Sequence, residues 1–206
     1  MKVYFVRHGS TDSLEKRISQ PDDEPLNENG RIQAKELGKR FVKTNLDLVI
    51  SSPYTRAVET AKAIREEVVT SELFKEVKKP TEVVGRSKDE EEVKNILKKI
   101  GEMYLTDPSW HFSDEESFED LKKRGLEALE FLKAQNKENI LVVSHGNFVA
   151  LLVGLMLYGE NYPVDVSLRL KNFLRFGNTG VSIVIYEEER WRLVCWNDTS
   201  HFLERN

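Results

Sequence analysis

The chain has 206 residues, 39% of them hydrophobic and 32% charged, a balance typical of a globular protein rather than a disordered or fibrous one. Its formal net charge of -4 argues against nucleic acid as a partner, and the lone Cys195 excludes an internal disulfide and a cysteine metal cluster. We find no signal peptide or uninterrupted apolar span, so we expect a cytoplasmic protein without a membrane partner, folded as one domain over residues 1–206.

Three strand-loop-helix units are predicted along the chain. The strands are residues 3–6, 46–50 and 139–144, and the helices that follow them are residues 27–42, the segment with Ala57, Thr60, Ala61 and Ile64, and residues 147–157. Repeated units of this kind predict a mainly parallel sheet with helices on both faces.

Two further helices and a hairpin complete the prediction. Residues 75–92 indicate a loop that leads into a helix over 90–104, and a second helix is expected over 116–135. Residues 181–186 and 191–196 flank a charged turn, as the strands of a hairpin would. The predicted fold class is therefore α/β, a three-layer α/β/α sandwich with a mainly parallel sheet and an antiparallel C-terminal edge.

Polar residues follow each of the three predicted strands. The segments are Arg7-His8-Gly9, Ser51-Ser52-Pro53 with Arg56 just beyond, and Ser144-His145-Gly146. Parallel strands end at one rim, where ligands bind, so two arginines and two histidines are expected to converge. The guanidinium fork suits a phosphate, and the backbone N–H groups around Gly146 and Asn147 open a helix that favours anions.

The convergent histidines suit phosphoryl transfer. A neutral imidazole can attack phosphorus, so one of the two can be a nucleophile while the other donates to phosphoryl oxygens. A leaving alcohol needs a proton, and Glu76 is the best-placed carboxylate because Glu72-Leu73-Phe74 could form a strand that ends at the same rim.

Several motifs together resemble the histidine phosphatase superfamily, which includes the phosphoglycerate mutases. They are Arg7-His8-Gly9 with Thr11, Leu26 with Gly30 and Gln33-Ala34, Ser51-Ser52-Pro53 with Arg56-Ala57 and Thr60-Ala61, Glu116-Ser117, Val143-Ser144-His145-Gly146, and Asn197-Asp198-Thr199-Ser200-His201. The resemblance spans nearly the whole chain and implies a phosphoglycerate mutase-like fold.

The resemblance also implies roles for individual residues. His8 would be the phosphorylated nucleophile, with Arg7, Arg56 and His145 binding the phosphoryl group and Glu76 as proton donor. Glu72 and Glu82 remain rivals of Glu76, because the sequence around the acid departs from the family pattern. Thr11 and Ser117 are further candidates for the site. The resemblance implies no metal and no organic cofactor, and the histidines show no metal-ligand spacing.

The expected function is hydrolysis of a small-molecule phosphate ester by a metal-independent, histidine acid phosphatase-type enzyme. Many members of the family carry Asn where this chain has Leu14, and the mutase-type insertion and W-x-N element are absent, which favours a phosphatase over a mutase. A mutase and a catalytically silent phospho-ligand-binding protein remain the alternatives. Residues 77–118 are expected to form the lid or wall that selects the alcohol, and a homodimer remains open.

Other polar residues can be explained by structural or surface roles. His111 and His201 lack a comparable setting, although His201 could support the rim. Glu116 and Arg124 lie on one predicted helix, where surface pairing and a role in the pocket are equally plausible.

Overall fold

Six strands form a single sheet in the computed structural model, which describes residues 1–202. The strands are β1 (Lys2–Arg7), β2 (Leu48–Ser51), β3 (Val69–Thr70), β4 (Asn139–Ser144), β5 (Val181–Glu187) and β6 (Arg190–Asp198). The sheet has the order β3-β2-β4-β1-β5-β6, with parallel pairing from β3 to β1 and antiparallel pairing of β1 with β5 and of β5 with β6. The predicted antiparallel C-terminal edge is confirmed.

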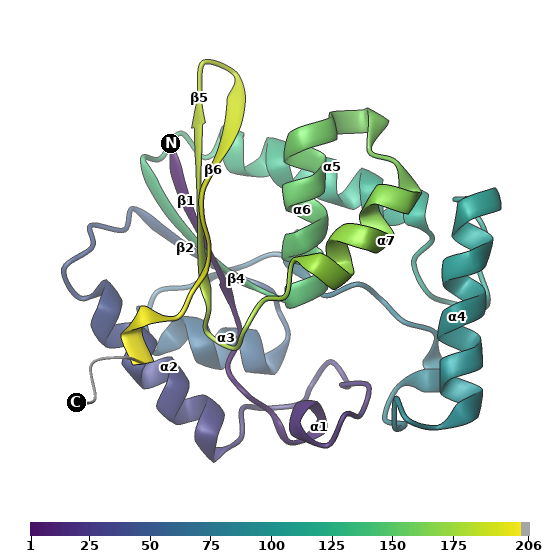
Figure 1. The fold of residues 1–206 in the computed structure, drawn as a ribbon. Helices are drawn as coiled ribbons and strands as arrows, with labels where there is room; N and C mark the ends of the chain where they lie inside the picture. The colour runs from purple at the N-terminus through teal and green to yellow at the C-terminus, as the bar shows by residue number, and fades with distance from the viewer. Residues whose placement is uncertain (203–206) are drawn as a thin grey trace.

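Helices cover both faces of this sheet (Figure 1). The helices among the described residues are α1 (Asp12–Glu15), α2 (Glu28–Phe41), α3 (Thr55–Lys62), α4 (Glu91–Thr106), α5 (Phe118–Ala134), α6 (Gly146–Tyr158) and α7 (Val164–Phe173). Successive residues of β4 alternate between two apolar clusters, because strand side chains point to opposite faces. Ile140 and Val142 pack in the cluster that contains α5 and α6, whereas Leu141 and Val143 pack in the cluster that contains α2 and α3. The predicted three-layer arrangement is confirmed.

The loop after β1 lies directly against the start of α2. Asn27 caps the helix by accepting a hydrogen bond from the Gly30 backbone N–H at 2.8 Å, and its own N–H donates to the Ser10 carbonyl at 3.1 Å. A Cβ atom on Gly9 would lie 2.6 Å from the Gly30 carbonyl oxygen, and one on Gly30 would lie 2.1 Å from the Ser10 carbonyl oxygen. Both positions therefore require glycine because two backbones touch there.

Two features differ from the prediction. The expected strand over Glu72-Leu73-Phe74 is a 3-10 helix, and the strand of that unit, β3, precedes it. The turn forms because the Ser71 side chain accepts a hydrogen bond from the Leu73 N–H. Helices α1 and α7 were not predicted, since α1 is a single turn and no residue of α7 is fully buried, which leaves little apolar periodicity.

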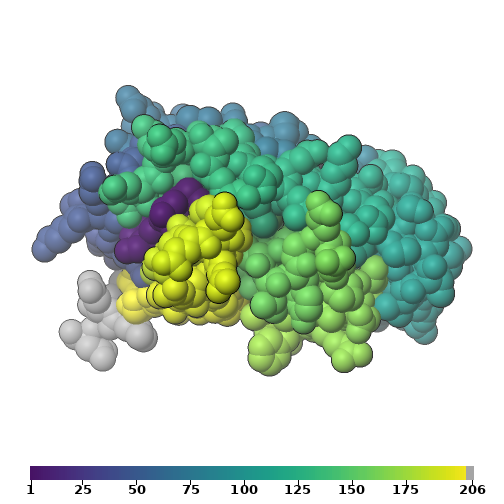
Figure 2. All heavy atoms as spheres, turned by 90° about the horizontal axis from the view of Figure 1, so that it is seen from above, coloured from purple at the N-terminus to yellow at the C-terminus, as the bar shows by residue number. Residues whose placement is uncertain are grey.

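Beyond the buried Phe74, the segment between β3 and α5 extends away from the sheet and includes α4. Figure 2 shows α4 at one end of the molecule, far from the β5–β6 hairpin. Within residues 1–202, no helix is long and apolar enough to cross a membrane.

Candidate active site

The carboxyl ends of β1, β2 and β4 bring the predicted rim together. Arg7 of β1 is in register with Ser144 of β4, and Ser51 of β2 is in register with Val143. The next residues are therefore neighbours, and the rings of His8 and His145 have centroids 5.1 Å apart. Both side chains are buried, with 1% and 0% of their surfaces exposed.

The His8 ring is oriented by its own loop. Its Nδ1 lies 2.7 Å from the Gly9 carbonyl oxygen, which can only accept, so Nδ1 carries the proton and Nε2 keeps its lone pair. The His8 backbone N–H donates to the Ser144 carbonyl at 3.1 Å. Burial, and then the charges of Arg56 and Arg7, hold the pKa of His8 well below its ordinary value. His8 is therefore a neutral imidazole with an unprotonated Nε2.

The two arginines each have an N–H group without a hydrogen-bond partner among the described residues. The Arg7 guanidinium donates to the Phe176 carbonyl and lies against Gly146, and Arg56 donates from Nη1 to the Pro21 carbonyl at 2.8 Å. Among the described residues, both Nε atoms are buried without a hydrogen-bond partner. Burial lowers the pKa of both guanidiniums, which nevertheless stay charged. Buried N–H groups are normally paired, so these two donors suit an anionic ligand.

His145 is linked to Arg56 and to the loop after β2. Its Nδ1 lies 3.5 Å from Nη2 of Arg56, and its Nε2 lies 2.8 Å from Ser52 Oγ, a hydroxyl that can donate or accept. Burial is the main cause that holds the pKa of His145 well below its ordinary value, followed by the nearby His8 and Arg56. The Tyr54 ring packs against both His145 and the Arg56 guanidinium.

Glu76 lies at the first turn of α6. Its Oε1 accepts hydrogen bonds from the backbone N–H groups of Phe148 at 3.1 Å and Val77 at 2.9 Å, and its Oε2 accepts from Asn147 Nδ2 at 3.3 Å. The rival carboxylates lie elsewhere: Glu72 pairs with Lys75 on an exposed surface, and Glu82 accepts a hydrogen bond from Ser113. Of the three, Glu76 alone lines the cavity described below.

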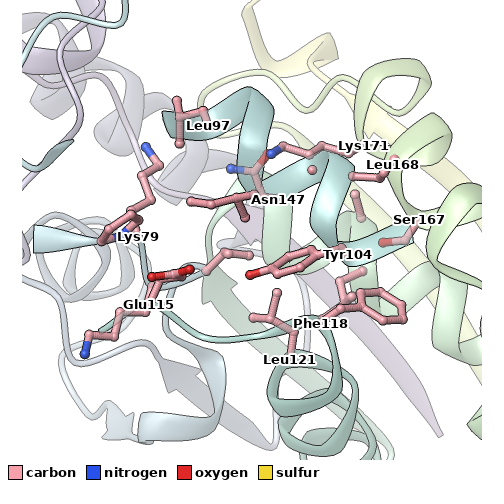
Figure 3. Close-up of a pocket in the computed structure, with 17 residues that line it drawn as sticks. Lys79, Leu97, Tyr104, Glu115, Phe118, Leu121, Asn147, Ser167, Leu168 and Lys171 are labelled. Carbon is pink, nitrogen blue, oxygen red and sulfur yellow. The ribbon is translucent and has the colours of Figure 1, made fainter. Parts of the chain in front are cut away.

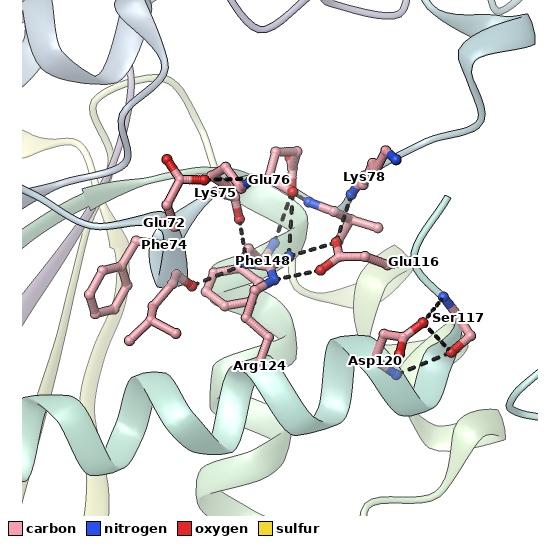
Figure 4. Close-up of polar contacts among 12 residues, drawn as sticks. Glu72, Phe74, Lys75, Glu76, Lys78, Glu116, Ser117, Asp120, Arg124 and Phe148 are labelled. Atoms are coloured by element: carbon pink, nitrogen blue, oxygen red, sulfur yellow. Dashed lines mark hydrogen bonds and ion pairs between the residues drawn. The ribbon is translucent and has the colours of Figure 1, made fainter. Parts of the chain in front are cut away.

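A side-chain brace, which we define as Arg124 and Glu116, holds the segment that carries Glu76 (Figure 4). The Arg124 guanidinium donates to the backbone carbonyls of Leu73 at 3.1 Å, Lys75 at 3.0 Å and Glu76 at 3.4 Å. Glu116 accepts from Arg124 Nε at 2.6 Å and from the Lys78 N–H at 2.9 Å. The Arg124 guanidinium also lies 4.1 Å from the centre of the Phe148 ring. The pair reaches beneath the Glu76 segment instead of pairing only on the surface.

The remaining predicted site residues lie in helix caps. Ser117 forms a capping box with Asp120 at the start of α5, and each of its side-chain hydrogen bonds goes to that residue. Thr11 caps α1 and accepts from Gln20 Nε2 at 2.6 Å. Neither side chain lines the cavity.

His201 contacts the rim indirectly. Its Nε2 lies 3.1 Å from Thr179 Oγ1, and the Thr179 N–H donates to the Arg7 carbonyl at 2.9 Å. This chain of contacts fits the expectation that His201 supports the rim.

A cavity of about 370 Å³ opens beside these residues. It is lined by Arg7, Arg56, Glu76 and Asn147, and also by Leu14, Asp22, Tyr54, Lys78, Lys79 and Lys88. Sequence reasoning did not single out the tyrosine or the lysines, because none belongs to a motif with a recognisable spacing. Among residues 1–202, no three His, Cys, Asp or Glu side chains come together as a metal site would require.

The chain matches known proteins along nearly its full length. The family model described as the histidine phosphatase superfamily (branch 1) matches residues 3–199. A Bacillus subtilis protein named uncharacterized phosphatase PhoE is 29% identical, covering 97% of this chain and 95% of the relative. An Enterobacter protein named probable phosphoglycerate mutase GpmB is 28% identical, covering 98% and 94%.

A similar fold has been solved with a ligand. The crystal structure of phosphoserine phosphatase from Entamoeba histolytica in complex with 3-phosphoglyceric acid has a TM-score of 0.78 and 28% sequence identity to this chain. The match covers 97% of this chain and 98% of that one.

Proposed function

The chain belongs to the histidine phosphatase superfamily, and we propose that it hydrolyses small-molecule phosphomonoesters through a phosphohistidine formed on His8. Relatives named as phosphatases support phosphatase activity. The observation that carries the proposal is the hydrogen bond between His8 Nδ1 and the Gly9 carbonyl, which leaves the lone pair on Nε2. This nitrogen belongs to a ring that lies next to two buried arginines.

The first step transfers the phosphoryl group to the protein. Arg7, Arg56 and His145 bind the phosphoryl oxygens, with further N–H donors from the start of α6 at Gly146. The lone pair of His8 Nε2 attacks phosphorus, and an N–P bond forms as the bond from phosphorus to the alcohol oxygen breaks. Protonated Glu76 gives its proton to that oxygen, so a neutral alcohol leaves.

The second step releases phosphate. A water molecule takes the place of the alcohol and gives a proton to the Glu76 carboxylate while its oxygen attacks phosphorus. The N–P bond breaks, His8 regains its lone pair, and inorganic phosphate leaves. Every proton and electron pair is accounted for by the ester, water, His8 and Glu76, so this route calls on no cofactor.

Residues 77–118 form the wall that selects the alcohol in this proposal. Val77, Lys78 and Lys79 line the cavity directly beyond Glu76, and Thr81, Val84 and Lys88 continue the same wall. The alcohol part of a bound ester would face these side chains.

Phosphoryl transfer back to the substrate, as in a mutase, is the second candidate function. A relative named as a phosphoglycerate mutase motivates it. The lifetime of the phosphoenzyme distinguishes the two functions. A mutase must protect phosphohistidine from water, so its phosphoenzyme is long-lived, whereas a phosphatase must let water reach it.

The test is hydrolysis of p-nitrophenyl phosphate at about pH 6 with EDTA present, a pH near the ordinary pKa of histidine. We expect intact protein to be active and His8→Ala to lose activity on the order of 10³-fold, because the nucleophile is gone. His111→Ala is the matched control, since the Nε2 of that histidine lies 3.4 Å from Asp120 Oδ2, outside the cavity. Full activity of His8→Ala would contradict the proposed nucleophile, and an inert intact protein would contradict the hydrolase assignment.

A further inference from the structure

The cavity beside His8 contains more positive charge than one phosphoryl group requires. Arg7 and Arg56 lie next to the histidines, and Lys79 and Lys88 also line the wall. Two acids line it as well, but among the described residues neither forms an ion pair with Lys79 or Lys88: Glu76 is hydrogen-bonded to the start of α6, and Asp22 interacts with the Tyr54 hydroxyl. The two lysines are therefore the side chains in the wall whose charge is not accounted for.

Neither lysine forms an ion pair with any residue from 1 to 202. The nearest hydrogen-bond partner of Lys79 Nζ is Ser19 Oγ at 3.5 Å, a neutral group. The neighbouring Lys78, by contrast, pairs with Asp114 at 3.2 Å. Lys79 and Lys88 are both half-buried. Glu76 attracts both lysines but forms an ion pair with neither of them. Two half-buried cations without an ion-pair partner are costly unless a ligand supplies the negative charge.

The pKa values of the two lysines also indicate that a negative charge would be favourable here. Burial lowers the pKa of Lys79 to about 8, and the charge of Lys88 is the next cause. Burial also lowers the pKa of Lys88, followed by the charge of Arg7. A bound anion would relieve this repulsion and favour the ammonium form of both lysines.

The backbone around both lysines is held in place by neighbouring segments. The Lys88 N–H donates to the Arg17 carbonyl at 2.9 Å, and the Ser19 N–H donates to the Arg86 carbonyl at 2.9 Å. On the other side, Pro80 directly follows Lys79 and is buried. The backbone of Lys88 thus lies in a hydrogen-bonded segment and that of Lys79 next to a buried proline, so ligand binding has little backbone entropy left to remove there.

Lys79 and Asn147 also line an adjoining, mainly apolar cavity of about 170 Å³ (Figure 3), so they lie between the two cavities. Lys171 of α7 lines that cavity and lowers the pKa of both lysines, so a third cation lies nearby. The positive potential therefore extends from the arginines along the wall where the alcohol would lie.

We propose that Lys79 and Lys88 bind a second anionic group, a carboxylate or a phosphate, on the alcohol part of the substrate. The preferred substrates are then esters with two anionic groups, one transferred and one retained. This inference rests on the proposed function, which places the transferred phosphoryl group at the two arginines.

The test compares matched esters. In 3-phosphoglycerate a carboxylate stands where glycerol 3-phosphate has a CH₂OH group, and fructose 1,6-bisphosphate adds a second phosphate to fructose 6-phosphate. We expect the diacidic member of at least one pair to have a kcat/KM higher by about tenfold, the effect of one charge-assisted hydrogen bond. The pair that shows the preference identifies the group as carboxylate or phosphate.

The variant Lys79→Gln/Lys88→Gln should reduce that preference by about tenfold, mainly through a higher KM for the diacidic ester. Lys94→Gln/Lys98→Gln is the matched control, because it removes the same charge from lysines of α4 that pair with Glu91 and Glu102. Equal kcat/KM within both pairs, or an unchanged preference in the Lys79→Gln/Lys88→Gln protein, would overturn the proposal.

A binding measurement separates this proposal from the proposed function. Calorimetry on His8→Ala, which cannot form the phosphohistidine, should show tighter binding of the diacidic ester than of its partner, and the two glutamines should remove the difference. If the intact protein hydrolyses no ester, the proposed function fails, and this difference alone decides the subsite. Equal affinities would reject the subsite even in an active phosphatase.

Discussion

The two halves of the candidate active site are built in different ways. His8, Arg7 and His145 lie on or directly after strands, and the sheet and its loops orient them. Glu76 and Lys79 lie instead on an irregular segment, which the Arg124 and Glu116 brace holds by side-chain contacts. The first half would bind the group that every phosphate ester shares, whereas the second would meet the part that varies. In the proposed mechanism, backbone geometry therefore positions the groups that act on every ester, and side chains of the irregular segment select the alcohol.

The largest loss of activity is expected from substitutions in the half that binds the phosphoryl group. Arg56→Ala should lower kcat/KM for all phosphate esters alike by about 10² to 10³, because it removes a fixed donor to the phosphoryl group. Arg56→Lys should recover part of the loss, since it keeps the charge but not the fork. Steady-state kinetics on several esters measures this.

Arg31→Ala is the control, because its exposed guanidinium pairs with Glu59 away from the cavity. An effect of Arg56→Ala that varied strongly with the alcohol would break the division between the two halves.

A smaller and selective effect is expected from the brace. Arg124→Lys should shift the Glu76 segment and lower kcat by about tenfold or more for glycerol 3-phosphate, whose alcohol needs a proton to leave. Hydrolysis of p-nitrophenyl phosphate should fall much less, because p-nitrophenolate leaves without a proton. The ratio of the two rates is the measurement.

Lys122→Gln, on the same helix and paired only with Glu119, provides the control for that ratio. Equal losses with both esters would mean that Arg124 acts only on stability and does not position the acid.

The smallest effect concerns pH. Because burial and two arginines lower the pKa of His8, its free imidazole persists at acid pH, and the acid limb of kcat/KM should lie below the ordinary value of 6.5. The unfolded imidazole binds a proton more readily than the folded one, so stability should fall as pH drops below 6.5.

A pH profile on p-nitrophenyl phosphate and thermal melts across the same range test both statements. An acid limb at or above 6.5, with stability rising as pH falls, would contradict the neutral, buried state of His8.

The sequence predicted the first half of the candidate site better than the second. Strands buried on both faces are continuous apolar runs, so the polar residues that end them stand out, as His8 and His145 do. The 3-10 turn over residues 72–74 depends on a local hydrogen bond from the Leu73 N–H, which apolar patterning cannot indicate. Lys79 and Lys88 were missed because their lack of an acidic partner is a property of tertiary packing.

The contact between Gly9 and Gly30 limits how this site could be transplanted. A designer who copied only the catalytic side chains onto another scaffold would omit the close backbone contact between the nucleophile's loop and the next helix. In a mutational library, substitutions at these two positions should be depleted by selection for folded protein alone, even when no ester is supplied. The pair would therefore report on the scaffold independently of catalysis.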